Sequence, residues 1–211
     1  MRRPRAAAPK LQIDGAADAR MTLALAHGAG APMDSPFMAA FAEGLAAKGL
    51  RVARFEFPYM AARRTTGGRK PPDPMAVLIE TWRAVVEALG VEDLAIGGKS
   101  MGGRAASMIA DESRVRGLVC LGYPFHPPGK PDRLRVEHLR TLTTPTLILQ
   151  GERDPLGDRK QVGGYELSPA IQVAWIPDGE HSFRPRKASG RTERQNWDAA
   201  IGRIATFLAA L

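Results

Sequence analysis

A serine lies near the middle of the chain in the stretch GGKSMGG, residues 97–103, which contains a Gly-x-Ser-x-Gly pattern. The apolar residues 94–96 before it predict a buried strand, and residues 101–111 after it are compatible with a helix. Between a strand and a helix, this pattern predicts a tight turn that lifts the hydroxyl of Ser100 clear of a sheet. The sequence therefore predicts that Ser100 is a nucleophile.

Small residues in two segments predict how a negatively charged oxygen would be held during attack by the serine. Gly98 and Gly102 fit the turn because a side chain at either position would clash, and the turn directs the N–H of Met101 toward the oxyanion. Residues 27–30, HGAG, follow another predicted strand, so the N–H of Ala29 could face the same oxygen. An ordinary strand-to-helix turn is the alternative for residues 27–30.

A serine hydroxyl is a weak nucleophile at neutral pH and needs a base, most often a histidine held by a carboxylate. Of the four histidines, His181 is the predicted base because it follows the last predicted strand. Asp154 follows the preceding strand and is predicted to orient the imidazole, with an ordinary turn aspartate before proline as the alternative. Asp178 and Glu152 are competing carboxylates, and Asp178 is poorly placed because only two residues separate it from His181.

The elements that must position these residues follow from the alternation of short apolar runs with longer amphipathic segments. This pattern predicts an α/β fold with a mostly parallel sheet of about six or seven strands and helices on both faces. The predicted strands cover residues 10–13, 21–26, 52–57, 93–100, 115–123, 145–150 and 171–176, and the predicted helices 35–48, 75–89, 101–111 and 195–211. Residues 58–74 are predicted to be an irregular loop. Since ligands bind at the carboxyl ends of parallel strands, the candidate residues should gather on one edge.

Length and composition predict one domain. The chain has 211 residues, of which 44% are apolar and 25% charged, so we assign residues 21–211 to a single domain and residues 1–20 to a mobile basic tail. No apolar run approaches the ~20 residues of a membrane span, and the tail lacks the apolar core of a secretory signal. The single cysteine, Cys120, lies in an apolar run, which predicts a core residue in a cytoplasmic protein.

The charge of the chain is positive but dispersed. The net charge is +8, and the excess falls in three separate segments without interleaved aromatic residues. A base-stacking surface needs such aromatic residues, so the pattern argues against a nucleic-acid partner. The motifs imply no metal ion and no cofactor, and they do not specify an oligomeric state.

These motifs resemble those of the α/β-hydrolase superfamily, and within it the small, nearly lidless group related to dienelactone hydrolases. More narrowly, they are similar to the testis-expressed hydrolase-like proteins and a hydrolase-like subunit of a histone acetyltransferase complex. The similar segments are HGAG (27–30), FEFP (55–58), KPPD (70–73), GGKSMGGR (97–104), QGERD (150–154) and GEHSF (179–183). The resemblance extends from about residue 20 to the C-terminus. It implies the α/β-hydrolase fold with a catalytic triad of Ser100, Asp154 and His181.

One departure from dienelactone hydrolases bears on the reaction. Those enzymes use a cysteine nucleophile, so Ser100 favours cleavage of a carboxylester or thioester instead. Only residues 125–144 are available as a cap, which predicts an open site and a small, accessible ester substrate. The alternative is a binding or scaffolding module of the same fold that no longer catalyses a reaction.

Four further residues are candidates for substrate binding. His27 and Gly30 belong to the loop that would hold the oxyanion, where His27 would fix the loop rather than carry a proton. Arg63 and Arg64 follow a predicted strand end, and guanidinium groups bind carboxylate or phosphate well. If they face Ser100, an anionic acyl substrate is favoured; a solvated surface loop is the alternative.

Overall fold

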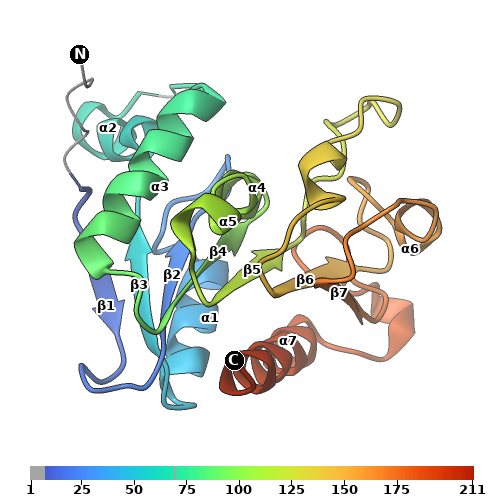
Figure 1. The fold of residues 1–211 in the computed structure, drawn as a ribbon. Helices are drawn as coiled ribbons and strands as arrows, with labels where there is room; N and C mark the ends of the chain where they lie inside the picture. The colour runs from blue at the N-terminus through green and yellow to red at the C-terminus, as the bar shows by residue number, and fades with distance from the viewer. Residues whose placement is uncertain (1–7, 69) are drawn as a thin grey trace.

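Within residues 8–68 and 70–211, which the computed structural model describes, seven strands form one sheet in the order β1-β3-β2-β4-β5-β6-β7 (Figure 1). The first strand is antiparallel to its neighbour and all other pairs are parallel. The strands are β1 (Gln12–Asp14), β2 (Thr22–Ala26), β3 (Arg51–Phe55), β4 (Leu94–Lys99), β5 (Gly117–Leu121), β6 (Thr146–Gly151) and β7 (Ile171–Ile176). The predicted α/β architecture is confirmed.

Helices cover both faces of this sheet. The helices are α1 (Pro36–Ala46), α2 (Pro58–Thr66), α3 (Met75–Leu89), α4 (Met101–Ser107), α5 (Ala110–Ser113), α6 (Arg159–Val162) and α7 (Glu193–Ala209), with short 3-10 turns η1 (Glu137–Leu139) and η2 (Lys187–Ser189). Helices α1 and α7 pack together, and α3 packs against α4 (Figure 1). None of the helices described is both long and apolar enough to cross a bilayer.

The alternation of side chains along the strands divides the core into two layers. On β2, Leu23 and Leu25 pack with residues of α1 and α7, whereas Ala24 and Ala26 face the layer that contains α3 and α4. Trp82 of α3 fills this second layer and is fully buried, with its ring 4.7 Å from that of Phe55. Cys120 lies in the same layer, as predicted for a core residue.

The structure differs from the sequence-based prediction at residues 58–66, which form α2 rather than an irregular loop. Pro58 occupies the first turn, where its missing N–H costs nothing, and Gly67 ends the helix at φ 67°. Tyr59 and Met60 are buried and anchor the helix to the core. Only these two of its nine residues are buried, so no long apolar period marks the helix in the sequence.

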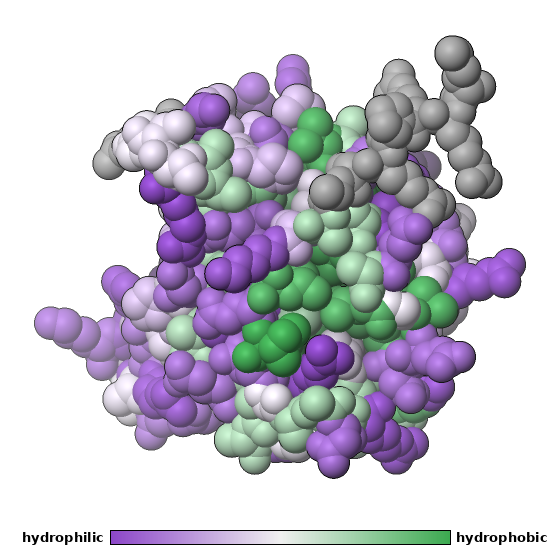
Figure 2. Space-filling view, turned by 90° about the vertical axis from the view of Figure 1, so that its left-hand side faces the viewer, coloured by the Kyte–Doolittle hydropathy of each residue, from purple (hydrophilic) through white to green (hydrophobic). Residues whose placement is uncertain are grey.

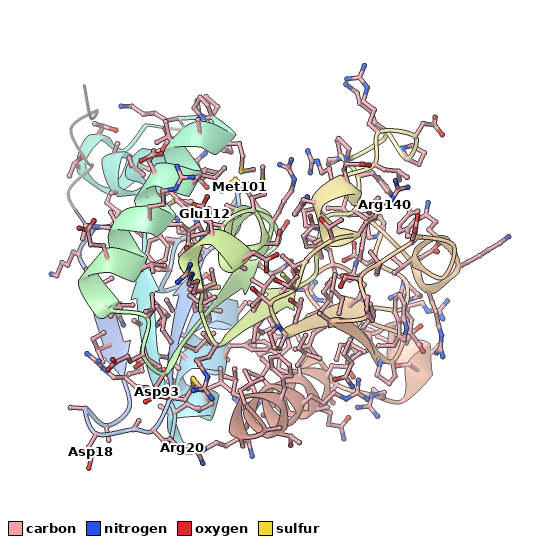
Figure 3. All side chains as sticks on the ribbon, viewed as in Figure 1. Asp18, Arg20, Asp93, Met101, Glu112 and Arg140 are labelled. Carbon is pink, nitrogen blue, oxygen red and sulfur yellow. The ribbon has the colours of Figure 1, made fainter. Side chains whose placement is uncertain are left out.

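Different segments of the chain lie at the two ends of the sheet. Figure 3 shows Met101, at the start of α4, at one end of the sheet, and Asp18, Arg20 and Asp93, which precede β2 and β4, at the opposite end. Segments that follow the parallel strands therefore gather at the end where Met101 lies. Figure 2 views the side formed by β1, α2 and α3, where apolar side chains gather amid hydrophilic ones.

Residues 8–20, the described part of the predicted tail, contribute β1 to the sheet. Arg54 of β3 is 2% exposed, and its guanidinium donates to both carboxylate oxygens of Asp14 at 2.9 to 3.1 Å. A further hydrogen bond from Arg54 reaches the carbonyl of Met33 at 2.8 Å. This ion pair fastens β1 to the sheet. Residues 1–7 lie outside the described residues, and the boundary between tail and domain stays a prediction.

Replacing Asp14 tests this attachment. We expect Asp14→Asn to lower the free energy of unfolding by about 2–3 kcal/mol, because the buried guanidinium of Arg54 loses its counter-charge. Urea titration followed by circular dichroism would measure the change. Asp18→Asn, at an exposed position of the same segment, is the control and should leave the midpoint unchanged. Equal midpoints for both variants would contradict the expectation.

Candidate active site

Ser100 follows β4 directly, and its backbone is strained. Its φ is 51° and its ψ −113°, a conformation that residues with a side chain rarely adopt. The N–H of Ser100 donates to the carbonyl of Leu121 on β5 at 2.9 Å, and its carbonyl accepts from the N–H of Arg104 on α4 at 3.0 Å. Strand and helix thus hold the strained turn in place, and strain held in this way is typical of a functional position.

The glycines around Ser100 permit close approach of three backbone segments. A Cβ atom on Gly98 would lie 2.5 Å from the carbonyl oxygen of Ala26 and 2.9 Å from the carbonyl carbon of Gly102. A Cβ atom on Gly102 would lie 2.5 Å from the carbonyl oxygen of His27. Only glycine fits at either position, because each of these neighbours is backbone that side-chain rotation cannot move away.

His181 lies in the loop after β7 and contacts the carboxylate predicted for it. Its Nδ1 is 2.8 Å from Oδ2 of Asp154, which is fully buried. Asp154 also accepts hydrogen bonds from Nε2 of Gln150 and from the N–H of Leu156, both at 2.9 Å. Because a carboxylate accepts, the bond assigns the proton to Nδ1 of His181 and leaves Nε2 with a lone pair. That lone pair can take a proton from a hydroxyl.

The two competing carboxylates are engaged elsewhere. Asp178 pairs with Arg186 at 2.5 Å and Arg153 at 2.9 Å, and the hydrogen bond from Arg186 holds the pKa of Asp178 below its usual range. Glu152 binds Arg159 at 2.9 Å and accepts from the N–H of Asp178. The structure therefore brings Asp154, rather than either competitor, to the imidazole of His181.

His27 is a buried structural residue of the loop that follows β2. Its Nε2 accepts from the N–H of Phe57 at 3.1 Å, so Nδ1 carries the proton and donates to the carbonyl of Gly28 at 2.6 Å. Burial lowers the pKa of His27, which keeps the ring neutral. Among the residues described it does not line the cavity beside Ser100, so its predicted contact with substrate is replaced by a role in shaping the loop.

Tyr59 orients the same loop from α2. Its hydroxyl lies 3.2 Å from the carbonyl oxygen of Gly28 and 3.1 Å from that of Ala29. Burial raises the pKa of Tyr59 to about 12, so the hydroxyl remains a donor. In a planar trans peptide the N–H opposes the C=O, so the N–H of Ala29 points away from Tyr59. Among the described residues, the N–H groups of Ala29 and Met101 have no acceptor and are available to an oxyanion.

A cavity of about 310 Å³ brings four of the candidate residues together. It is lined by residues 28–31, Ser35, Phe37, Met38, Lys99, Ser100, His181 and Ser182. Ser100, His181, Ala29 and Gly30 thus share one cavity, and Asp154 lies behind His181. Segments far apart in the sequence meet here because each follows a parallel strand, as predicted.

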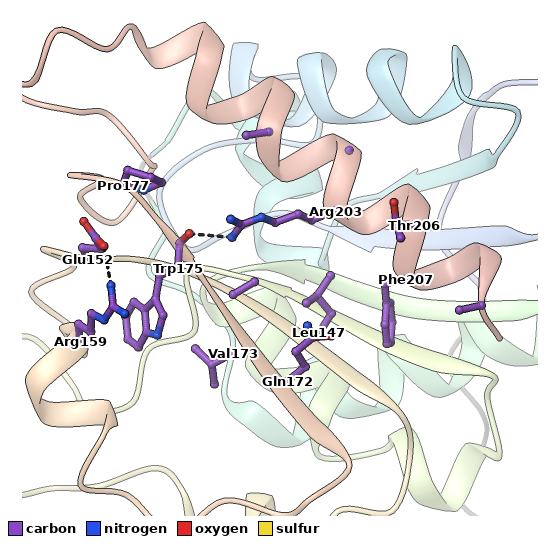
Figure 4. Close-up of a pocket in the computed structure, with 14 residues that line it drawn as sticks. Leu147, Glu152, Arg159, Gln172, Val173, Trp175, Pro177, Arg203, Thr206 and Phe207 are labelled. Atoms are coloured by element: carbon purple, nitrogen blue, oxygen red, sulfur yellow. Dashed lines mark hydrogen bonds and ion pairs between the residues drawn. The ribbon is translucent and has the colours of Figure 1, made fainter.

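A larger hollow of about 1000 Å³ lies elsewhere, between β7 and α7 (Figure 4). Its charged groups bind one another or the backbone: Arg159 pairs with Glu152, and Arg203 donates to the carbonyl of Trp175 at 2.7 Å. It contains none of Ser100, Asp154 and His181, so we place the chemistry in the smaller cavity.

The two arginines predicted to border the substrate, Arg63 and Arg64, do not line the cavity beside Ser100. Arg64 binds Glu56 at 2.6 Å and Asp34 at 2.7 Å, so its charge is already neutralised. The guanidinium of Arg63 donates to the carbonyl of Lys70 and lies over the ring of Tyr59. Both arginines have partners from α2 and neighbouring segments, so the structure does not bring them to Ser100 as the predicted anion-binding role requires.

Helix α7 braces the loop that carries His181. Asn196 is fully buried and donates to the carbonyls of Pro177 and Phe183 at 3.0 and 2.8 Å, and Nε1 of Trp197 donates to the carbonyl of Ser182 at 3.1 Å. Neither Asn196 nor Trp197 was predicted to belong to the site. The sequence signal that could have identified Asn196 is a polar residue among the apolar, buried positions of a helix.

A second serine and histidine pair lies outside the cavity. Oγ of Ser107, on α4, is 2.9 Å from Nε2 of His138 on η1, and it donates to the carbonyl of Arg104 at 2.7 Å. Among the described residues no carboxylate holds His138, whose pKa burial lowers. The pair lacks the strained backbone and the oriented base found at Ser100.

The chain was compared with known proteins. A family model described as an alpha/beta hydrolase domain matches residues 19–209. Among solved structures, an α/β serine hydrolase homologue from Coxiella burnetii aligns with a TM-score of 0.69 at 20% identity, covering 92% of this chain and 89% of that one. A lidless α/β serine hydrolase from Xanthomonas campestris gives 0.66 at 19% identity, covering 92% and 88%. A dienelactone hydrolase from Anabaena variabilis gives 0.69 at 19%, covering 95% and 90%. These structures share the fold of this chain.

Proposed function

The chain belongs to the α/β-hydrolase domain family, and from this premise we propose that it is a serine hydrolase that cleaves carboxylester or thioester bonds. The observation that carries the proposal is the bond from His181 to a fully buried Asp154, at a cavity that also contains the strained Ser100. A buried carboxylate that fixes the tautomer of a partly exposed imidazole is the arrangement needed to activate a hydroxyl.

In the first half of the reaction, Nε2 of His181 takes the proton of Ser100 as Oγ attacks the carbonyl carbon of the substrate. The carbonyl oxygen becomes negative and accepts hydrogen bonds from the N–H groups of Ala29 and Met101, each worth about 3–4 kcal/mol of the barrier. The bond to the leaving alcohol or thiol then breaks, and His181 returns its proton to the leaving atom. Ser100 is left acylated.

In the second half, water attacks the acyl group on Ser100. Nε2 of His181 takes a proton from the water, and the same two N–H groups hold the second oxyanion. The bond between Oγ and the acyl carbon breaks, the acid leaves, and the proton returns to Ser100. Asp154 stays ionised throughout and stabilises the imidazolium of His181 in both halves.

The surroundings of the cavity support a small substrate. Between β5 and β6, residues 125–144 form one short 3-10 turn, η1. Within the described chain, this connection contains no helix that exceeds η1 in length. A cavity of about 310 Å³ lies at the small end of the range for ligand pockets. We therefore propose a short, accessible acyl group as the substrate.

Labelling with a fluorophosphonate probe tests the proposal. We expect the purified protein to become labelled, because the probe reacts with a serine that a base has activated. Ser100→Ala and His181→Ala should each abolish labelling. Gel fluorescence would measure the signal, and circular dichroism would confirm that each variant folds.

The second serine and histidine pair provides the matched control. Ser107→Ala and His138→Ala should keep their labelling, because this pair lies outside the cavity. If a folded wild-type protein does not react, the hydrolase proposal is wrong, and a binding or scaffolding role for the same fold becomes the better reading.

A further inference from the structure

Lys99 places a buried positive charge beside the nucleophile. It is the last residue of β4, immediately before Ser100, and it lines the same cavity while only 8% of it is exposed. Its Nζ donates to the carbonyl of His181 at 2.8 Å and lies 5.7 Å from the ring centroid of Phe37 on α1. The ammonium therefore lies between the loop that holds the base and an apolar wall.

The protein provides a hydrogen-bond acceptor for only part of this ammonium group. An ammonium has three N–H donors, and the carbonyl of His181 is its one hydrogen-bond acceptor among the described residues. The charges of Asp154 and Glu180 favour its protonated form, but among the described residues neither carboxylate accepts a hydrogen bond from Nζ. Asp154 binds His181 and two further groups, and Glu180 accepts from the N–H groups of Ser182 and Arg184.

A buried charge with unused donors is costly unless a ligand completes its hydrogen bonds. Burial lowers the pKa of Lys99 to about 8, so the group is mostly charged at neutral pH. A bound anion would supply the missing acceptors and a negative charge in direct contact with Nζ. The cavity that Lys99 shares with Ser100 is where such an anion could enter.

We propose that Lys99 makes this cavity selective for esters that carry a carboxylate or a similar anionic group close to the scissile bond. The inference rests on the serine-hydrolase function proposed above and names the substrate class of the same site. In this proposal Lys99, rather than Arg63 and Arg64 of α2, attracts the anionic substrate. Both arginines already bind other groups.

Two pairs of isosteric esters test the charge preference. For charge on the acyl side, monomethyl succinate is compared with uncharged methyl isocaproate; for charge on the alcohol side, acetoxyacetate is compared with isobutyl acetate. Hydrolysis is followed by pH-stat titration, and each pair gives a ratio of kcat/KM values. We expect the wild-type protein to prefer the charged member of one pair by at least about tenfold.

Lys99→Met should abolish this preference while leaving fluorophosphonate labelling detectable. The variant also loses the bond to the carbonyl of His181, which slows both esters of a pair equally and cancels in the ratio. Lys48→Met, an exposed lysine at the other end of the sheet, is the control and should keep the wild-type ratio. A ratio that Lys99→Met leaves unchanged would mean that Lys99 only positions His181.

The pH dependence of the wild-type ratio tests the same point without a substitution. As pH rises through about 8, Lys99 loses its proton and the preference should disappear, while the substrate carboxylate stays ionised. The ionisable groups that face Lys99 are Asp154, Glu180 and His181, and α1 presents the apolar Phe37. A ratio that stays constant from pH 7 to 9, or a labelled wild-type protein without preference in either pair, overturns the inference and leaves the hydrolase function standing.

Discussion

Asp154→Asn is expected to lower kcat by about 10⁴-fold while the protein stays folded. Asp154 accepts from His181, Gln150 and the N–H of Leu156, so all of its neighbours are donors. An asparagine amide brings an NH₂ group into this set. In the place of Oδ1, the NH₂ group opposes the N–H of Leu156. In the place of Oδ2, it opposes Nε2 of Gln150 and drives the proton of His181 from Nδ1 to Nε2. In that tautomer the imidazole cannot take the proton of Ser100.

Single-turnover hydrolysis of an activated ester and the rate of fluorophosphonate labelling would both measure this loss. The matched control is Asp178→Asn, which changes the carboxylate nearer to His181 in sequence but paired with Arg153 and Arg186 in the structure. It should change kcat by no more than a few fold. A large loss in Asp178→Asn with little in Asp154→Asn would show that the wrong carboxylate has been assigned.

Gly98→Ala is expected to destabilise the fold by on the order of 3–5 kcal/mol and to abolish labelling of Ser100. The added methyl group would lie 2.5 Å from the carbonyl oxygen of Ala26 and 2.9 Å from two backbone atoms of residues 102 and 103. These atoms belong to β2 and α4, so relief requires the strand and the helix to move apart. That movement would also release the strained backbone of Ser100.

Urea unfolding would measure the free energy, and Gly202→Ala is the matched control. Gly202 lies in the interior of α7 with nothing within 4 Å of the added methyl group. There the same substitution should stabilise the protein by about 0.5–1 kcal/mol, because alanine favours a helix. If both variants unfold at the same denaturant concentration, the close packing around Gly98 is not a constraint on the fold.

The sequence predicted the arrangement of the strands well because its strongest signals are local. Ser100, Asp154 and His181 each lie in the segment that follows a short apolar run. Because such segments meet at the carboxyl edge of a parallel sheet, these residues are expected to lie close together. Ser100 and His181 do share a cavity, as that rule implies. Their catalytic roles, and that of Asp154, stay predictions until the labelling experiment is done.

The sequence could not settle questions that depend on partners distant in the chain. Arg64 looks free in the sequence because Glu56 and Asp34, which neutralise it, come from two other segments. The choice between Asp154 and Asp178 likewise depends on where two arginines point. The burial of Lys99 could not be predicted either, because the loop of His181 that contacts it comes from a distant part of the chain.

The packing of α1 against α7 has a consequence for how the molecule assembles during synthesis. The ring of Phe37 on α1 lies 5.5 Å from that of Trp197 on α7, yet every strand from β3 to β7 is encoded between them. On the ribosome, the part of α1 that packs against α7 therefore remains uncovered until α7 emerges. Because α7 also holds the loop of His181 through Asn196, the event that closes the core completes the reactive site. A nascent chain thus exposes an apolar surface before the loop of His181 is held in place, and chaperones protect such exposed surfaces from aggregation.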